Sequence, residues 1–118
     1  MSIRRGDVVL VDWPFAGGAG SKLRPALVVQ NDRDNGRLTN TIIAMITSQT
    51  RRAFEPTQLP IAVGTAEGKQ TGLRFDSVVN CINLFTVEQT KILRTIGSLP
   101  GSLLVQLDAC LKAALDLH

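Results

Sequence analysis

The sequence has few of the residues that most catalytic and metal sites use. Its 118 residues include one histidine, two cysteines, one tryptophan and no tyrosine. Because there is only one histidine, a mechanism built on a histidine pair within one chain is excluded. The histidine is His118, the last residue, and chain termini are commonly frayed, so we do not expect a mechanism built on it. Cys81 and Cys110 lie in apolar surroundings without CxxC spacing, which indicates buried free thiols. We therefore expect no metal and no cofactor.

Long hydrophobic runs are also absent. No uninterrupted apolar segment approaches the length of about 18 residues that a membrane-spanning helix needs. The first residues, MSIRR, lead directly into a strand pattern, so we expect neither a membrane span nor a cleaved signal. The sequence predicts one soluble, cytoplasmic domain covering residues 1–118.

Charge is unevenly distributed along the chain. The net charge is +3, and residues 1–74 contain 10 Lys and Arg against 6 Asp and Glu. Several of these cations fall in segments rich in Gly, Thr or Pro, which are typical of loops. Basic loops on an otherwise balanced domain suit a polyanion such as RNA or DNA, although a solvated basic surface without a ligand is an open alternative.

The hydrophobic pattern predicts mostly short strands. Residues 6–13 and 24–31 are rich in Val and Leu, and a glycine-rich loop joins them. Further strands are expected at 41–47, at 73–85 and at 95–100, with a proline-containing edge strand at 57–63. Asn35-Gly36 indicates a turn, and residues 48–56 and 63–72 are interpreted as loops.

Two helices are expected. Thr86 followed by Gln89 resembles a capping box, which predicts a short helix over 88–94. Ser102 is a plausible N-cap for a helix over 102–117, where leucines recur at helical spacing. The fold class that follows is mainly β with a C-terminal helix, as a small, strongly bent barrel.

Six segments follow one another along the chain, and a final apolar helix comes after them: RGDVVLVDWPF, GSKLRPALVV, IAMITS, GLRFDSVV, INLFTV and IGSLP. In this order they resemble the MazF/PemK family of toxin endoribonucleases from bacterial toxin–antitoxin pairs. The resemblance covers the chain from Gly6 to Leu117. It implies an SH3-like barrel, a homodimer, a MazE/PemI-like antitoxin partner, and metal-independent cleavage of single-stranded RNA to a 2′,3′-cyclic phosphate and a 5′-hydroxyl.

The resemblance also implies the site residues. Arg24 of the RP pair and Thr47 of the ITS triplet fall at the positions of the catalytic arginine and threonine. An arginine presents a fork of charged donors that fits phosphate oxygens, and a threonine hydroxyl can both donate and accept. The alternative for Arg24 is a structural ion pair with Asp12 or Asp32.

Further candidates are less specific. Arg74, Asp76 and Ser48 are candidates for catalysis or phosphate positioning, although Asp76 and Ser48 also suit ordinary roles at the ends of strands. RNA contacts are expected from four residues of two loops: Ser21, Lys22, Arg51 and Arg52. Trp13 and Phe15 are interpreted as core aromatics in preference to base-stacking groups.

Two other functions stay open at this point. A CcdB-like poison resembles this fold but binds DNA gyrase and cuts nothing, and a toxin homologue can lose its activity and keep its fold. An arginine and a hydroxyl converging on phosphate favour the nuclease, because a gyrase binder does not need them.

Overall fold

The computed structural model describes residues 2–13 and 22–118. Its strands are β1 (Asp7–Trp13), β2 (Lys22–Val28), β3 (Asn40–Thr47), β4 (Gln58–Ile61), β5 (Ser77–Glu88) and β6 (Ile92–Ser98). Its helices are α1 (Asp32–Arg37), α2 (Ala66–Gln70), α3 (Gly101–Leu115) and a 3-10 turn, η1 (Gln89–Lys91).

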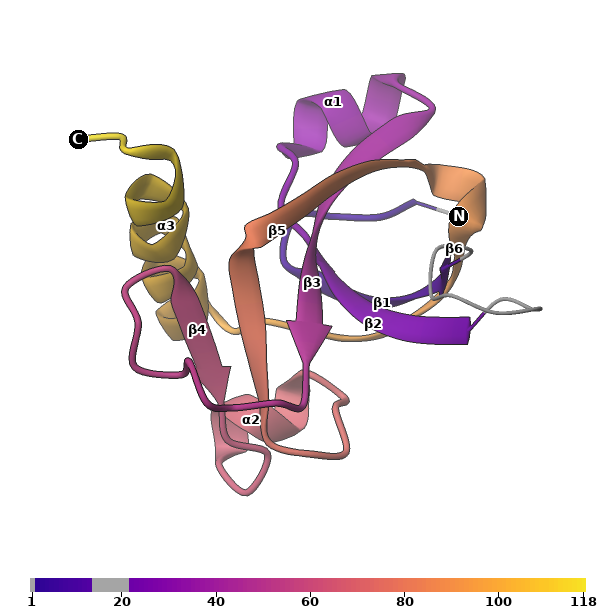
Figure 1. Ribbon diagram of the computed structural model, residues 1–118. Coiled ribbons are helices and arrows are strands. Elements are labelled where there is room, and N and C mark those ends of the chain that lie inside the picture. Colours follow the sequence, from indigo (N-terminus) through magenta and orange to yellow (C-terminus); the bar gives the residue numbers. More distant parts are fainter. Residues whose placement is uncertain (1, 14–21) are drawn as a thin grey trace.

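The strands form one curved antiparallel sheet in the order β4-β5-β3-β2-β1-β6 (Figure 1). Its hydrogen-bonded ladder is open between β4 and β6, so the structure is barrel-like without closing. Helix α3 packs beside β4 and β5. The predicted fold class, mainly β with a C-terminal helix, is confirmed.

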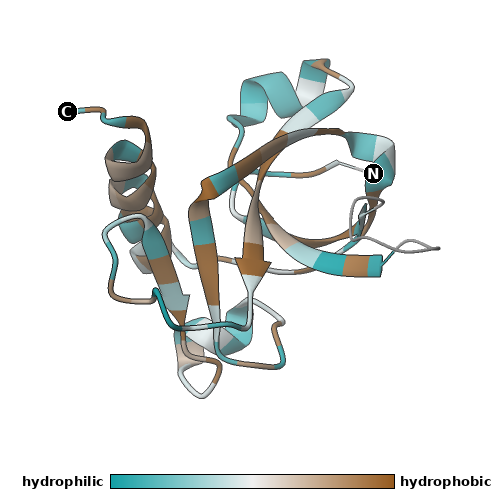
Figure 2. Cartoon of the chain, in the orientation of Figure 1, coloured by the Kyte–Doolittle hydropathy of each residue, from teal (hydrophilic) through white to brown (hydrophobic). Residues whose placement is uncertain are grey.

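Both faces of this sheet are buried, because successive strand residues point to opposite sides. In β1, Val8 belongs to the cluster that also contains Leu103 and Leu107 of α3. Its neighbours Val9 and Val11 belong to a second cluster on the other face. Figure 2 shows the resulting brown segments along the sheet, in contrast to the mostly teal α1. Burial on both faces explains why these strands consist of nearly continuous apolar runs.

The predicted helix over 88–94 is wrong. Thr86 is paired with Ile42 of β3, so it lies inside a strand and cannot cap a helix. Strand β5 continues to Glu88, and β6 already begins at Ile92, which is buried in the second cluster. Strand pairing and burial therefore outweigh the local capping signal.

Two short helices replace an expected turn and an expected loop. Asn35 and Gly36 lie inside α1, whose N-cap is Asn31, with its side chain accepting from Asp34 N at 2.9 Å. Helix α2 lies within the predicted loop 63–72 and begins after Thr65, whose hydroxyl accepts from Gly68 N at 2.9 Å. In both cases a polar side chain caps a helix too short to show periodicity in the sequence.

Helix α3 begins one residue earlier than predicted. Pro100 is its N-cap, and Ser102 lies in the first turn, where its hydroxyl bonds the carboxylate of Glu67. Within the described residues, no helix is long and apolar enough to cross a membrane.

Candidate functional site

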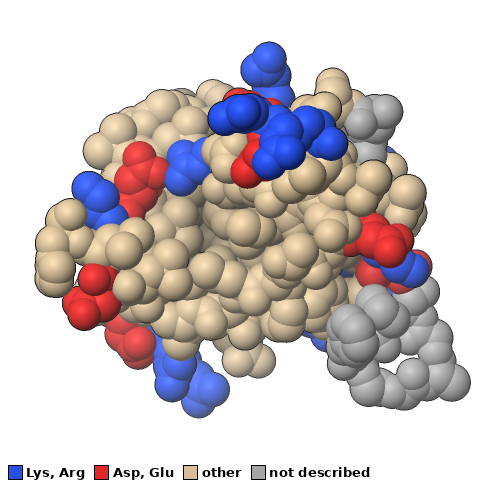
Figure 3. Space-filling view, turned by 90° about the horizontal axis from the view of Figure 1, so that it is seen from above, with Lys and Arg blue, Asp and Glu red and all other residues tan. Residues whose placement is uncertain are grey.

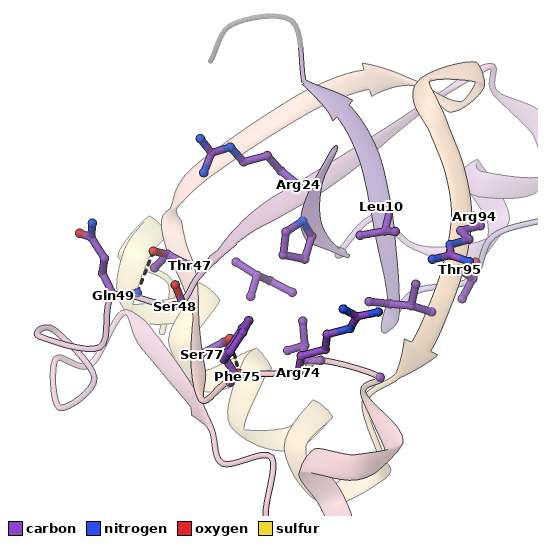
Figure 4. Close-up of a pocket in the computed structure, with 15 residues that line it drawn as sticks. Leu10, Arg24, Thr47, Ser48, Gln49, Arg74, Phe75, Ser77, Arg94 and Thr95 are labelled. Carbon is purple, nitrogen blue, oxygen red and sulfur yellow. Dashed lines mark hydrogen bonds between the residues drawn. The ribbon is translucent and has the colours of Figure 1, made fainter. Parts of the chain in front are cut away.

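One cleft collects side chains from five separate parts of the chain. Its volume is about 790 Å³. It is bounded by β1, β2, the end of β3, the segment 72–77 and β6 (Figure 4). The polar or charged side chains that line it are Arg24, Thr47, Ser48, Gln49, Arg74, Ser77, Arg94 and Thr95. The predicted pair, Arg24 and Thr47, therefore lies in one cleft, together with Ser48 and Arg74.

Arg24 is exposed on β2, where it pairs with Val11 of β1. Neither carboxylate that the sequence offered as its structural partner holds it. Asp32 accepts from the backbone N–H of Arg5 at 2.6 Å, and Asp12 Oδ1 is buried without a hydrogen bond to any residue that the structure describes. Among the described residues, Arg24 forms no ion pair, so its charge is available to a ligand.

The hydroxyl of Thr47 is held at the end of β3. Its oxygen accepts a hydrogen bond from the backbone N–H of Gln49 at 3.1 Å (Figure 4). This local bond satisfies an acceptor position of the hydroxyl and leaves its proton to donate elsewhere. The geometry therefore favours Thr47 as a hydrogen-bond donor toward the cleft.

Arg74 reaches the cleft because two glycines let its segment approach β6. A Cβ on Gly72 would lie 2.1 Å from the carbonyl oxygen of Ile96, and one on Gly97 would lie 2.3 Å from the carbonyl carbon of Thr71. Gly72 also has a φ of +74°, a conformation that glycine adopts most readily. The close approach places Arg74 opposite Arg94 of β6 (Figure 4).

A second cleft, of about 570 Å³, continues from the first. Thr47 and Gln49 line both. The remaining walls come from the segment after β3, from β4 and from β5: Arg51, Arg52, Gln58, Asn80 and Asn83. The two clefts therefore form one continuous track with a change from hydroxyls and arginines to amides.

The track is positively charged. Five arginines and no Asp or Glu are among the described residues that line the two clefts. On the face in Figure 3, Lys and Arg lie in groups near Asp and Glu, and most of the surface between them is uncharged. A polyanion is thus attracted most directly to the track.

The family model that describes a PemK-like, MazF-like toxin of type II toxin–antitoxin systems matches residues 4–115. This chain belongs to that family. A match of such length agrees with the resemblance carried by the six sequence segments.

Similar sequences and structures extend over the whole toxin. The chain is 36% identical over 119 residues to Endoribonuclease MazF6 of Mycobacterium tuberculosis, covering 99% of this chain and 100% of that one. It is 31% identical over 118 residues to Endoribonuclease EndoA of Bacillus subtilis, covering 99% and 97%. The structure of the Mycobacterium tuberculosis toxin MazF-mt6 aligns with a TM-score of 0.77 at 27% identity, covering 95% and 98%.

A further solved structure confirms the fold. It is described as an endoribonuclease in complex with its cognate antitoxin from Mycobacterial species, and it aligns with a TM-score of 0.80 at 20% identity, covering 98% and 97%.

The remaining predicted site residues of this toxin are more scattered. Arg51 and Arg52 line the second cleft, and Arg52 also forms an exposed ion pair with Glu55 at 3.5 Å. Lys22 is exposed at the start of β2 and lines neither cleft, and Ser21 lies outside the described residues.

The side chain of Asp76 forms a structural hydrogen bond with the backbone of Val63. Its Oδ1 accepts from the backbone N–H of Val63 at 2.9 Å, which ties the segment before β5 to the end of β4, and it is not among the residues that line either cleft. This contact agrees with the structural alternative for the Asp-Ser pair.

Sequence reasoning missed several residues of the track. Arg94 lies in the predicted helix 88–94, and Phe75 lies in the GLRFDSVV segment without a predicted role, yet Phe75 lines the first cleft with 70% of its surface exposed. A large exposed aromatic side chain beside arginines indicates base stacking, but its exposure is known only from the folded structure. The core assignment of Trp13 is correct, since it is buried against Phe85, while Phe15 lies outside the described residues.

The two cysteines of the toxin are buried in the cluster under α3. Burial raises the pKa of the Cys81 thiol to about 12, and it raises the pKa of Cys110 as well. Thiols protonated to this degree are poor nucleophiles and poor ligands. Within residues 2–13 and 22–118, no group of three or more His, Cys, Asp or Glu is placed to hold a metal ion.

Proposed function

We propose that this chain is the toxin of a type II toxin–antitoxin pair and acts as an endoribonuclease on single-stranded RNA. The observation that carries the proposal is the first cleft, where Arg24, free of any carboxylate partner among the described residues, lies with the oriented hydroxyl of Thr47. The names of the relatives, Endoribonuclease MazF6 and Endoribonuclease EndoA, support the same activity.

The proposed reaction uses the RNA's own 2′-hydroxyl as the nucleophile. Its oxygen attacks the adjacent phosphorus and loses its proton, while the bond from phosphorus to the 5′-oxygen breaks and that oxygen gains a proton. The products are a 2′,3′-cyclic phosphate and a 5′-hydroxyl. Negative charge grows on the phosphate oxygens in the transition state, so preorganised donors lower the barrier.

Arg24 and Thr47 supply such donors. A guanidinium stays protonated at neutral pH, so Arg24 contributes charge and hydrogen bonds and does not remove the proton. Its planar fork can hold two phosphate oxygens at once. Thr47 donates its hydroxyl proton to a phosphate oxygen, since its own oxygen already accepts from Gln49 N.

The other arginines position the RNA strand. In the proposed complex, Arg74 and Arg94 hold a phosphate on one side of the reacting group, and Arg51 and Arg52 hold phosphates on the other. Such contacts provide affinity without sequence preference. We assign Asp76 the structural contact with Val63 and no step of the reaction.

The proposal includes two protein partners. A cognate antitoxin with a disordered, acidic and apolar segment would complement the arginine-lined track, because its carboxylates replace the phosphates. A homodimer and a cytoplasmic location are part of the proposal as the family resemblance implies them. The gyrase-poison alternative is not favoured, since a track of five arginines next to an oriented hydroxyl suits a nucleic-acid strand.

The experiment is a cleavage assay on a long single-stranded RNA in the presence of EDTA. Wild-type toxin, freed of antitoxin, should make discrete cuts that leave cyclic phosphate and 5′-hydroxyl ends. Arg24→Ala and Thr47→Ala should each lower the cleavage rate by about 100-fold or more, the usual effect of removing one transition-state donor.

The matched control is Arg33→Ala. Arg33 is an exposed arginine of α1 that lines neither cleft, so cleavage should persist. Absence of cleavage by folded wild-type toxin would refute the nuclease function. Unchanged cleavage by Arg24→Ala would refute the role given to that residue.

A further inference from the structure

The second cleft contains an amide pair whose orientation the backbone determines. Between Ala44 and Met45 of β3, the register with β5 shifts from Leu84 to Asn80, so residues 81–83 form a bulge. Asn80 organises this bulge, because its Oδ1 accepts from the backbone N–H of Ile82 at 3.1 Å. Bulges of this kind redirect side chains and often occur next to active sites.

Gln58 of β4 completes the arrangement. It is only 4% exposed, and its Nε2 donates to Asn80 Oδ1 at 2.9 Å and to Thr57 Oγ1 at 3.0 Å. Two donors therefore occupy Asn80 Oδ1, which fixes the amide of Asn80 in one of its two orientations.

Each of the two amides keeps one polar group without a hydrogen bond to any described residue: a donor on Asn80 and an acceptor on Gln58. In the part of the chain that the structure describes, no hydrogen bond uses Asn80 Nδ2 or Gln58 Oε1. Both residues line the second cleft, together with the exposed side chain of Asn83. The cleft thus offers one N–H donor and one carbonyl acceptor from neighbouring, preorganised amides.

We propose that Gln58 and Asn80 read one unpaired nucleobase of the RNA and so help to set the cleavage sequence. The inference rests on the proposed nuclease function. Neutral amides are suited to this task, because a base edge presents donors and acceptors side by side, whereas arginines bind phosphates of any sequence. Proteins that read single-stranded RNA use this kind of contact to unstacked bases.

The position of the base follows from the continuity of the track. Thr47 and Gln49 line both clefts, so a base in the second cleft belongs to a nucleotide next to the phosphate held by Arg24 and Thr47. Arg51 and Arg52 line the same cleft and can hold the phosphate that follows. A pair of hydrogen bonds to a base edge typically gives a preference of about 5- to 150-fold over the wrong base.

The test replaces the donor of Asn80 by an acceptor of the same shape. In Asn80→Asp, one carboxylate oxygen still accepts from Ile82 N and Gln58 Nε2, and the other stands where Nδ2 was. The substrate is a pool of single-stranded RNAs with randomised nucleotides, and sequencing of the products yields the preference at each position around the cut. We expect the preference at one position adjacent to the cut to change by about 5-fold or more, with the other positions unchanged.

Asn40→Asp is the control for the added charge. Asn40 is exposed at the start of β3 and lines neither cleft, so its variant should cut with the wild-type preferences. Thermal melting shows whether Asn80→Asp is folded. Should it unfold, Asn83→Asp, on the exposed wall of the same cleft, should change the preference at the same position.

The outcomes separate this inference from the function on which it rests. If wild-type toxin leaves the RNA pool uncut, both the nuclease function and the base-reading role are refuted. Wild-type cutting with an unchanged preference profile in the folded variant overturns only the base-reading role. A uniform loss of cleavage at every sequence overturns it as well, since that result indicates charge repulsion of the phosphates and no contact with a base.

Discussion

Replacing Gly72 by alanine should separate the segment that carries Arg74 and Phe75 from β6. The added Cβ would lie 2.1 Å from the carbonyl oxygen of Ile96, a distance that no side chain can relieve because the neighbour is backbone. The φ of +74° adds a conformational cost for any residue with a Cβ. The alanine variant can fold only with this turn displaced.

The magnitude combines two effects. The left-handed backbone costs an alanine about 1–2 kcal/mol. Steric overlap relieved by a backbone shift costs about 1–3 kcal/mol more. The free energy of unfolding should therefore fall by about 2–5 kcal/mol. At an unfolding entropy of about 2 cal/mol/K per residue, each kcal/mol corresponds to about 4 °C, so Tm should fall by about 8–20 °C.

The assay is thermal unfolding by circular dichroism, with Gly36→Ala as the matched control. Gly36 lies in α1, and a Cβ there would meet no atom within 4 Å. Alanine is preferred to glycine in a helix by about 0.5–1 kcal/mol, so this variant should gain about 2–4 °C. A Tm for Gly72→Ala equal to that of wild type would refute the close approach. RNA cleavage measured well below Tm should also fall, since Arg74 leaves the cleft.

Two further predictions concern single side chains. Burial raises the pKa of Cys81 from an ordinary value of 9.0 to about 12, so its thiol should not react with a thiol reagent at pH 8 until the protein unfolds. Since the unfolded chain loses this proton first, stability should decline as pH rises from about 9 toward 12, and a stability that rises in this window would contradict the burial. Phe75→Ala should weaken binding of a non-cleavable 2′-deoxy-substituted RNA, measured by fluorescence anisotropy, by about 5- to 150-fold through the loss of one stacked base. Phe54, 99% exposed and outside both clefts, supplies the control, and equal losses in Phe54→Ala would argue against stacking at Phe75.

Local patterns predicted the strands, and they singled out two residues that the structure places in one cleft, Arg24 and Thr47. Runs of Val, Leu and Ile specify β1, β2 and β3, because these strands are buried on both faces. Arg24 and Thr47 stand near the ends of two such runs, so local motifs single them out, and the folded chain then places both in one cleft.

The errors have a common cause in contacts between distant segments. Residues 88–94 carry a helix-capping signal, but pairing of β5 with β3 and of β6 with β1 makes them strand and turn. The same pairing brings Arg94 into the cleft, which no local signal indicates. Helices α1 and α2 are too short for a periodic pattern, and their capping side chains are visible as caps only once the chain is folded.

The sequence by itself determined the strands and the terminal helix, and it singled out Arg24 and Thr47 as site candidates, because burial and motif chemistry act along short segments. Only the tertiary structure decided which other groups join them. Close packing at Gly72 and Gly97 brings Arg74 to Arg94, and the bulge in β5 turns Asn80 toward Gln58. These contacts depend on strand register and on how closely two backbone segments pack, which are properties of the whole folded chain.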